Sequence, residues 1–348
     1  MKNIAVISTD WHLQSKNLEQ IIKLNEQEII EANNHGTKLH IWLGDIFDSR
    51  VSQRQDILNG LTRIIEMYDE AGHQIICISG NHDKTNYNSR DSFLDAYKYH
   101  PSFDLIDDID VRNIEGVNCY FAPFFEDKLL YENLEAVEGK EGLLFGHFAV
   151  SGSVNNDGTK VENRIKPSMF KSFQKVFLGH YHNYQEIGGN ILHLGSLSQN
   201  DFSDDEFKGF WLLSLEKGEI FFDLIPSKGV SFKKLEINLE EVSQKQVKEL
   251  IYQFKKENEG ANLRVIVKGN GDSVQSFDSH EYQELGIDIK KKVNEIEGVD
   301  ADERISAVNA LSAEDITDRF KNFCEENSYD YEEGMVILKE ILYGDKRG

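Results

Sequence analysis

Five short polar segments of this chain each follow an apolar run that reads as a buried strand. In order they are Asp10-Trp11-His12, Gly44-Asp45-Ile46-Phe47-Asp48, Gly80-Asn81-His82-Asp83, Gly146-His147 and Gly179-His180-Tyr181-His182. Aspartate and histidine with one asparagine suit transition metals that have some preference for oxygen, such as Mn²⁺, Fe²⁺ or Zn²⁺. No cysteine belongs to these segments, which argues against a structural zinc site.

The spacing within the segments suits a shared metal site. Alternate side chains of an extended segment point the same way, so Asp10 with His12, and His180 with His182, can each offer two ligands to one place. A glycine before a ligand lets the backbone turn sharply and approach the metal closely. One such pair occurs by chance, and a single histidine is more often a packed or surface residue. Five in this order, each after an apolar strand, favour the functional interpretation.

The elements that must position these residues follow from the apolar pattern. Residues 3–8, 39–43 and 74–79 read as buried strands, and residues 15–33 and 52–70 carry helical apolar spacing. This order predicts parallel strands, whose carboxyl ends gather ligands at one edge of a sheet. Further strands are predicted at 117–122, 142–146, 175–179, 190–195, 209–215 and 219–225. Two packed sheets with outer helices is the simplest arrangement.

The remainder of the chain reads as two further units. Pro226-Ser227-Lys228-Gly229 has the composition of a boundary. Beyond it we predict a strand at 231–239, a helix at 246–258, a strand at 263–267 and a helix at 288–296. Residues 303–348 have the apolar spacing of short amphipathic helices. We therefore expect domains at 1–227 and 228–300, and a helical tail at 301–348.

The bulk composition is that of a globular protein with an acidic balance. The chain has 348 residues and a formal net charge of −23. No stretch approaches the roughly 20 apolar residues that span a bilayer, so no membrane partner is expected, and the polar N-terminus does not read as a signal peptide. The scattered cysteines Cys77, Cys119 and Cys324 fit free thiols in a reducing, cytoplasmic compartment. A nucleic-acid partner would need local cations or a second protein to offset the charge.

The five segments together resemble the calcineurin-like metallophosphoesterase superfamily, whose pattern is DxH, GDxxD, GNHD, GH and GHxH. The resemblance covers about residues 1–225. It is closest to the SbcD-type DNA repair nucleases and the recombination endonuclease subunits of T-even-like phages. Gly195-Ser196, Asp201 and Lys208-Gly209-Phe210 are similar to the GS…D…GF element of these nucleases. Leu197 stands where members usually have proline.

The resemblance implies an α/β (α+β) fold: a four-layer αββα two-sheet sandwich with a small α+β capping domain and C-terminal helices. It also implies two divalent metal ions, with Mn²⁺ expected first and Mg²⁺, Fe²⁺ or Zn²⁺ as alternatives. One metal would be held by Asp10, His12, Asp45 and His182, and the other by Asp45, Asn81, His147 and His180. His82 would be the catalytic histidine, Asp83 would orient it by accepting a hydrogen bond, and Asp48 would support the site.

The implied activity is that of a DNA exonuclease and single-strand endonuclease that hydrolyses phosphodiester bonds. The cations would clamp the attacking and leaving oxygens of an in-line displacement. The capping domain would guide DNA, and the tail would bind the coiled coil of an SMC-type, SbcC-like ATPase. A homodimer within a heterotetramer, in the cytoplasm (the host's, if the chain is viral), is the expected assembly. The chain has no Walker A sequence, so ATP use would belong to the partner.

The same residues are compatible with other functions. Another metallophosphoesterase, acting on phosphoproteins or small nucleotides, would share every ligand. A non-enzymatic scaffold would typically lack some ligands, and none is missing here. The tail helices could instead pack on their own domain. Several basic residues beyond the boundary could touch phosphates or could be solvated surface residues: Lys228, Lys233, Lys234, Lys255, Lys256, Arg264 and Lys268.

Overall fold

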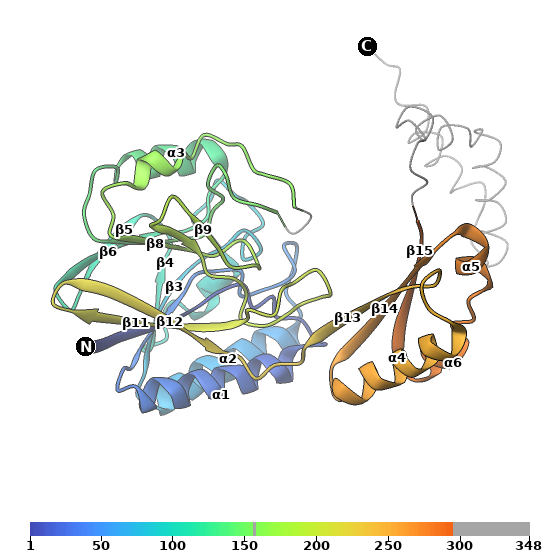
Figure 1. Ribbon diagram of the computed structural model, residues 1–348. Coiled ribbons are helices and arrows are strands. Elements are labelled where there is room, and N and C mark those ends of the chain that lie inside the picture. Colours follow the sequence, from blue (N-terminus) through green and yellow to red (C-terminus); the bar gives the residue numbers. More distant parts are fainter. Residues whose placement is uncertain (156–157, 295–348) are drawn as a thin grey trace, which may run out of the picture.

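The structure, a computed structural model, describes residues 1–155 and 158–294 (Figure 1). Two six-stranded sheets and one three-stranded sheet organise this part of the chain. The predicted tail at 301–348, including Cys324, lies outside the described residues. Within the described ranges, no helix has both the length and the apolar character needed to cross a bilayer.

The first sheet begins with alternating strands and helices, as the sequence predicts. Its order is β12-β11-β1-β2-β3-β4, with β1 at Lys2–Ser8, β2 at Leu39–Trp42, β3 at Gln74–Ile78, β4 at Phe103–Ile106, β11 at Gly209–Glu216 and β12 at Glu219–Pro226. Strands β1 to β4 are parallel. Helix α1, Leu18–Asn34, joins β1 to β2, and α2, Gln55–Glu70, joins β2 to β3. The carboxyl ends of β1, β2 and β3 therefore lie at one edge.

The second sheet has a parallel core of its own. Its order is β5-β6-β7-β8-β10-β9, with β5 at Asp110–Ile114, β6 at Val117–Ala122, β7 at Leu143–Gly146, β8 at Lys175–Leu178, β9 at Gln185–Ile187 and β10 at Ile191–His193. Strands β6, β7, β8 and β10 are parallel. Helix α3 spans Asp127–Glu135, and short 3₁₀ turns span Phe93–Tyr97 and Pro167–Phe170.

The buried side chains define four layers. Neighbouring residues of a strand point to opposite faces, so Val6 packs in one cluster with Ile21 of α1, whereas Ile7 packs in another with Phe145 of the second sheet. On the outer face of the second sheet, Leu144 packs with Leu130 of α3. The order is thus helices, sheet, sheet, helix (Figure 1), which confirms the expected two-sheet α/β sandwich.

The three-stranded sheet follows the sandwich in sequence. It consists of parallel strands β13 at Phe232–Asn238, β14 at Asn262–Gly269 and β15 at Ile287–Val293, with helices α4 at Gln244–Glu257, α5 at Gly271–Ser276 and α6 at His280–Glu284. The helix predicted at 288–296 is wrong for the described residues, because β15 occupies this segment. Ile287 and Ile289 alternate with the polar Asp288 and Lys290, a period of two that suits a strand. The backbone of β15 forms its strand hydrogen bonds with β14.

Candidate metal centre

All five polar segments meet where strands of the two sheets end. Asp10, Asp45 and Asn81 follow β1, β2 and β3, while His147 and His180 follow β7 and β8. The segments are tied by backbone hydrogen bonds, for example from Asp10 N to Gly44 O at 3.0 Å and from Gly179 N to Gly146 O at 3.0 Å. The sheet topology thus brings together residues that lie far apart in the sequence, such as His12 and His182, which are 170 positions apart.

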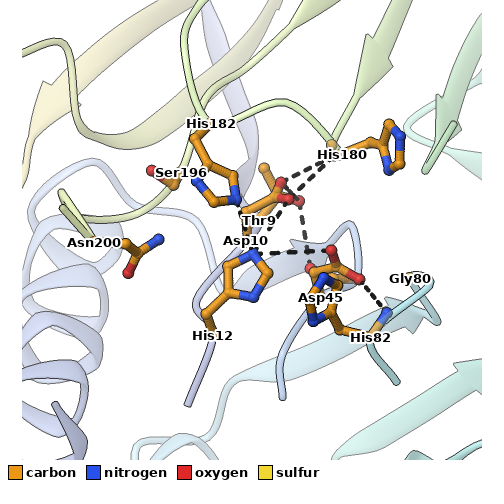
Figure 2. A network of polar contacts seen from close by, with 12 residues as sticks. Thr9, Asp10, His12, Asp45, Gly80, His82, His180, His182, Ser196 and Asn200 are labelled. Atoms are coloured by element: carbon orange, nitrogen blue, oxygen red, sulfur yellow. Dashed lines mark hydrogen bonds and ion pairs between the residues drawn. The ribbon is translucent and has the colours of Figure 1, made fainter. Parts of the chain in front are cut away.

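One group of donors consists of Asp10, His12 and His182. The His12 Nε2 atom lies 3.0 Å from His182 Nε2 and 3.9 Å from Asp10 Oδ1. Figure 2 shows the two imidazoles and the carboxylate pointing toward one another. Their ligand atoms all lie within 4.8 Å of each other, so this group is able to hold one cation.

A second group lies beside the first and shares a carboxylate with it. Asn81 Oδ1 is 2.9 Å from His180 Nδ1 and 3.2 Å from His147 Nε2. Asp45 Oδ2 lies 3.4 Å from His147 Nε2 and 3.8 Å from His12 Nε2. Asp45 therefore stands between the two groups, within reach of both.

The donor set fits divalent cations. The Nε2 atoms of His12 and His182 lie 3.0 Å apart, and two imidazole nitrogens at this distance repel each other unless a proton or a cation lies near both. The carboxylates of Asp10 and Asp45 are almost fully buried beside them, and burying anionic groups is costly unless a positive charge compensates. Mixed nitrogen and oxygen donors are suited to Mn²⁺, Fe²⁺ or Zn²⁺.

The protonation states suit metal ligation at two of the four candidate histidines, while nearby carboxylates outweigh burial and raise the pKa of the other two, His147 and His182. Burial lowers the pKa of His12 to about 3 and that of His180 to about 3, so both rings are neutral, as a ligand must be. Burial opposes charge on His147, but the facing Asp45 carboxylate outweighs it and raises the His147 pKa to about 9. The same contact lowers the pKa of Asp45 despite its burial. This ion pair carries the charge balance that a cation would otherwise supply.

The backbone at the centre is strained. In the described part of the chain, six non-glycine residues have positive φ, and four of them are candidate ligands: Asp10, His12, Asp45 and His180, at 54°, 48°, 51° and 85°. Such conformations cost about 1–3 kcal/mol each and persist where the surrounding structure enforces them, often at functional sites. The strain therefore indicates a site whose geometry matters more than its stability.

Two glycines permit the close approach of the segments. A Cβ on Gly44 would lie 2.4 Å from the Gly80 nitrogen, and a Cβ on Gly80 would lie 2.2 Å from Asp45 Oδ1. Gly44 also has a φ of 86°, which side chains rarely adopt. Any larger residue at either position would push the segments of β2 and β3 apart.

His82 lies at the rim of the cluster, with both ring nitrogens engaged outside it. Its Nδ1 is 2.6 Å from the Asp48 carbonyl oxygen, and its Nε2 is 2.6 Å from a guanidinium nitrogen of Arg50. His12, Asp45 and His82 are close enough to bind a cation together. The guanidinium beside Nε2 disfavours that arrangement, because it would repel the cation. Asp48 also faces His12, with Oδ1 3.7 Å from Nδ1.

Asp83 differs from its predicted role in its contacts. Its carboxylate accepts hydrogen bonds from the backbone nitrogens of Phe47 at 3.0 Å and Gly80 at 2.8 Å. The His82 ring is oriented by the Asp48 carbonyl instead. Asp83 thus acts on His82 through the backbone that it ties together, and not by the direct hydrogen bond that the sequence suggested. Burial and the neighbouring Asp45 raise the pKa of Asp83 to about 7.

Sequence reasoning missed two residues that touch the centre. Asp204 lies 3.4 Å from His182 Nδ1, whereas the sequence pattern pointed to Asp201, its neighbour in an acidic run that gives no sign of which carboxylate turns inward. Arg50 follows the second segment by two positions, with no pattern to distinguish it from other surface arginines. A pocket of about 350 Å³ opens over the centre and is lined by His12, Gln14, Lys16, Asp48, His82, His182, Asn200 and Asp201.

Comparison with known families and proteins agrees with this geometry. The family described as calcineurin-like phosphoesterase matches residues 3–210. Exonuclease subunit 1 of Enterobacteria phage T4 is 25% identical over 218 residues, which covers 60% of this chain and 63% of that protein. The chain therefore matches less than two thirds of the phage protein's length. A subunit of the nuclease SbcCD of Staphylococcus saprophyticus is 24% identical over 279 residues, covering 69% of this chain and 73% of that protein.

Solved structures give more distant matches. A novel archaeal phosphodiesterase aligns with a TM-score of 0.35 at 13% identity, covering 64% of this chain and 99% of that one. The nuclease MPE of Pseudomonas putida aligns with a TM-score of 0.29 at 13% identity, covering 60% of this chain and 83% of that one.

Proposed function

The chain belongs to the calcineurin-like phosphoesterase family, and we propose that its metal-dependent phosphodiesterase activity is directed at DNA. The proposed enzyme is an exonuclease and single-strand endonuclease. Two relatives support this substrate, since one is named as an exonuclease subunit and the other as a nuclease subunit. The observation that carries the hydrolytic activity is the convergence of seven candidate metal ligands beneath an open pocket, whereas the choice of DNA rests on the names of the two relatives.

The proposed metal assignment follows the two donor groups. Asp10, His12 and His182 hold one ion, Asn81, His147 and His180 hold the other, and Asp45 bridges them. The distances of 3.4 and 3.8 Å from Asp45 Oδ2 to the histidines on either side support the bridge. Mn²⁺ is the proposed metal, because the set combines imidazole with carboxylate and amide oxygen.

The residues around the ions would position the phosphodiester. When bound, the cations supply Lewis-acid stabilisation of the charge that develops on the phosphoryl group. His82 faces the Asp48 carbonyl through Nδ1, and its Nε2 accepts a hydrogen bond from the Arg50 guanidinium. Once Arg50 turns to a bound phosphate and the ring takes up a proton, Nε2 would donate that proton to the leaving oxygen. Arg50 lies beside that atom, and its guanidinium suits a phosphate oxygen. Lys16 lines the same pocket and adds a second cation.

The three-stranded sheet is proposed to guide DNA. Along β14, buried Leu263, Val265 and Val267 alternate with Arg264, Ile266 and Lys268 on the other face. The strand register sets Lys234 beside Arg264 and Lys292 beside Lys268 on that second face. On the same face, Arg264 is ion-paired with Asp288 and Lys268 with Glu236, so the excess of lysines supplies its net positive charge. Such an excess favours phosphate contacts and offers local positive charge that the whole chain lacks.

The assembly of the chain with other proteins is a proposal by resemblance. The names of both curated relatives mark them as parts of larger complexes. We propose that residues 228–300 form the capping domain and that residues 301–348 bind an SMC-type ATPase in a heterotetramer with two copies of this chain. An ATPase partner would also offset the net charge of −23 that opposes DNA binding.

The test compares substrates under one set of conditions. Purified protein with Mn²⁺ is given end-labelled duplex DNA, circular single-stranded DNA, bis-p-nitrophenyl phosphate and a phosphopeptide. Release of nucleotides from duplex and nicking of the circle are expected, with EDTA abolishing both. Hydrolysis of the small ester or the phosphopeptide with both DNAs intact would reject the nuclease and leave another phosphoesterase. The Asp45→Asn variant serves as the control for contaminating nucleases.

A further inference from the structure

The segment 199–208, here called the bridging loop, lies between the metal centre and the three-stranded sheet. It leads from the region after β10 into β11. Asn200 and Asp201 line the pocket over the centre, while other residues of the same loop touch β13 and β14. The loop therefore contacts both parts of the molecule.

At the centre, the loop contributes a buried carboxylate to His182. The His182 ring turns Nε2 toward His12, at 3.0 Å, and Nδ1 toward Asp204 Oδ1, at 3.4 Å. The Asp204 side chain is 1% exposed, and its other oxygen accepts the Asn200 backbone N–H at 2.6 Å. The contact to Nδ1 is an ion pair, since Asp204 Oδ1 has no hydrogen-bond partner among the described residues. A buried carboxylate that faces the far nitrogen of a ligating histidine favours the tautomer with a proton on that nitrogen and restrains the ring.

A buried lysine holds the backbone of the same histidine. Lys208 Nζ donates to the His182 carbonyl at 2.5 Å and lies 3.0 Å from both Asn183 Oδ1 and Asp205 Oδ1. Its side chain is 4% exposed. Asp204 and Lys208 of the bridging loop thus hold His182 at its ring and at its main chain, respectively.

The other side of the loop is attached to the three-stranded sheet. Gln199 Oε1 accepts the backbone N–H of Phe232 in β13 at 2.9 Å, and Gln199 Nε2 donates to the Asp204 carbonyl at 3.1 Å. The Phe202 ring packs edge to face on Phe232 with centroids 5.1 Å apart, and the Arg264 guanidinium of β14 lies 4.0 Å from the Phe202 centroid. A continuous run of contacts therefore leads from β13 to the metal centre.

We propose that Asp204 is a positioning residue for His182, and that Gln199 links this position to the three-stranded sheet. A displacement of β13 would move Gln199, and through it Asp204 and the His182 ring. The sheet, where we propose that DNA is guided, is thereby mechanically coupled to one of the two ions. This inference rests on the proposed metal centre and not on the identity of the substrate.

The first experiment measures Mn²⁺ binding by the loss of the free-ion electron paramagnetic resonance signal, in the full chain and without DNA. The wild type is expected to bind two ions. Asp204→Ala is expected to bind one of them about 10–100-fold more weakly, as for other residues that orient a metal ligand. Asp204→Asn, which keeps a hydrogen-bond acceptor, should recover part of that loss. The control is Glu206→Gln, which removes a charge from the same loop at an exposed side chain that pairs with Lys233 and not with His182, and it should bind as the wild type does.

A double-mutant cycle separates positioning from a general loosening of the loop. In a His182→Ala background, adding Asp204→Ala should change the Mn²⁺ affinity no further, because the ring that it orients is gone. Additive losses would show that Asp204 acts on the fold and not on His182, and would overturn the proposal. Circular dichroism of each variant checks that it is folded.

The link to the sheet is tested by Gln199→Ala. This variant should weaken the same ion by a few fold, while Lys233→Ala, which removes the exposed ion pair to Glu206 between the same two regions, should not. Equal Mn²⁺ binding by wild type, Asp204→Ala and Gln199→Ala would overturn this inference and leave the metal centre intact. A wild type that binds no Mn²⁺ would overturn both.

Discussion

A buried cluster of polar side chains that includes histidines lies at each end of strands β2 and β3, and the two clusters differ in how their side chains are arranged. At the carboxyl ends, Asp45 and Asn81 face histidines of other strands across 3–4 Å gaps. At the amino ends, His40 and His73 lie side by side, with His40 Nε2 2.8 Å from His73 Nδ1. Both clusters are buried, and both mix histidine with acidic residues.

The side chains of the amino-end cluster are joined mainly by hydrogen bonds, while His40 Nδ1 lies at an ion-pair distance of 3.5 Å from Glu28 Oε2 and neither accepts nor donates a hydrogen bond among the described residues. His73 Nε2 lies 3.2 Å from Asn33 Oδ1, so both of its ring nitrogens have partners. The Tyr68 hydroxyl lies 2.8 Å from Asn25 Oδ1 and 3.1 Å from a carboxylate oxygen of Glu28. The side chains at the amino end form a chain of pairwise contacts, whereas the candidate metal ligands at the carboxyl end point toward the same two positions. Convergence, and not the presence of histidine and acid, distinguishes a metal site from a polar core.

The largest expected effect is at the bridge between the two donor groups. Asp45→Asn should reduce phosphodiester hydrolysis by at least about 10³-fold, because losing several kcal/mol of charge stabilisation costs a factor of ten per 1.4 kcal/mol. Bound Mn²⁺ should fall from two ions toward one, as measured by atomic absorption after gel filtration. Glu28→Gln, the same kind of change at the amino end, should retain both ions and full activity. Loss of metal in Glu28→Gln would erase the distinction between the clusters.

A smaller effect is expected at the rim of the centre. His82→Ala should lower the turnover rate by about 10²-fold, the contribution of a positioned acid or base, with both metal ions still bound. The reason is that its ring nitrogens contact Asp48 and Arg50 and not the donor groups. Unchanged cleavage would refute its assignment as a proton donor, and loss of metal would make it a ligand.

At the amino end the expected effect is on stability alone. Tyr68→Phe removes the hydroxyl that contacts Asn25 and Glu28, and leaving those buried acceptors without it should cost about 1–3 kcal/mol in the free energy of unfolding. Urea denaturation in EDTA measures this cost. Mn²⁺ affinity and cleavage should match the wild type; a change in either would indicate that the two ends are coupled.

The smallest expected effect is a pH dependence of stability at the same cluster. Burial, with the neighbouring His40, lowers the pKa of His73 to about 4. A base whose folded pKa is depressed gives stability that is present above its unfolded pKa of about 6.5 and is lost as the pH falls toward 4. In EDTA, the melting temperature of the wild type should therefore fall further between pH 7 and pH 5 than the melting temperature of His73→Gln. An equal change of melting temperature with pH in the two proteins would show that His73 does not contribute to the pH dependence of stability.

Much of the fold was accessible from the sequence, because buried parallel strands are continuous apolar runs. Strands β1, β2, β3 and β6 lie within a residue or so of their predicted ranges. Strand β5, Asp110–Ile114, was missed since its exposed, charged residues show no apolar run, although Glu115 and Gly116, with φ of 53° and 86°, make the tight turn of a hairpin. Strand β15 was mistaken for a helix because lysines dominate its exposed positions.

The predicted ligands come together in the structure because each lies at the end of a strand. The order of the strands in the sheets determines which of these ends are neighbours. The contacts around them were less accessible. Asp83 was expected to hydrogen-bond His82, but its carboxylate turns inward to backbone amides. Asp204 and Arg50 gave no signal, because the orientation of a loop side chain depends on packing across distant segments and not on local spacing.

The most direct test of the central claim is anomalous scattering from crystals soaked in Mn²⁺. Two peaks are expected: one among Asp10, His12 and His182, the other among Asn81, His147 and His180, with Asp45 touching both. An absence of peaks in this cluster, or a peak at His40 and His73 instead, would contradict the distinction between converging donors and a hydrogen-bonded polar core.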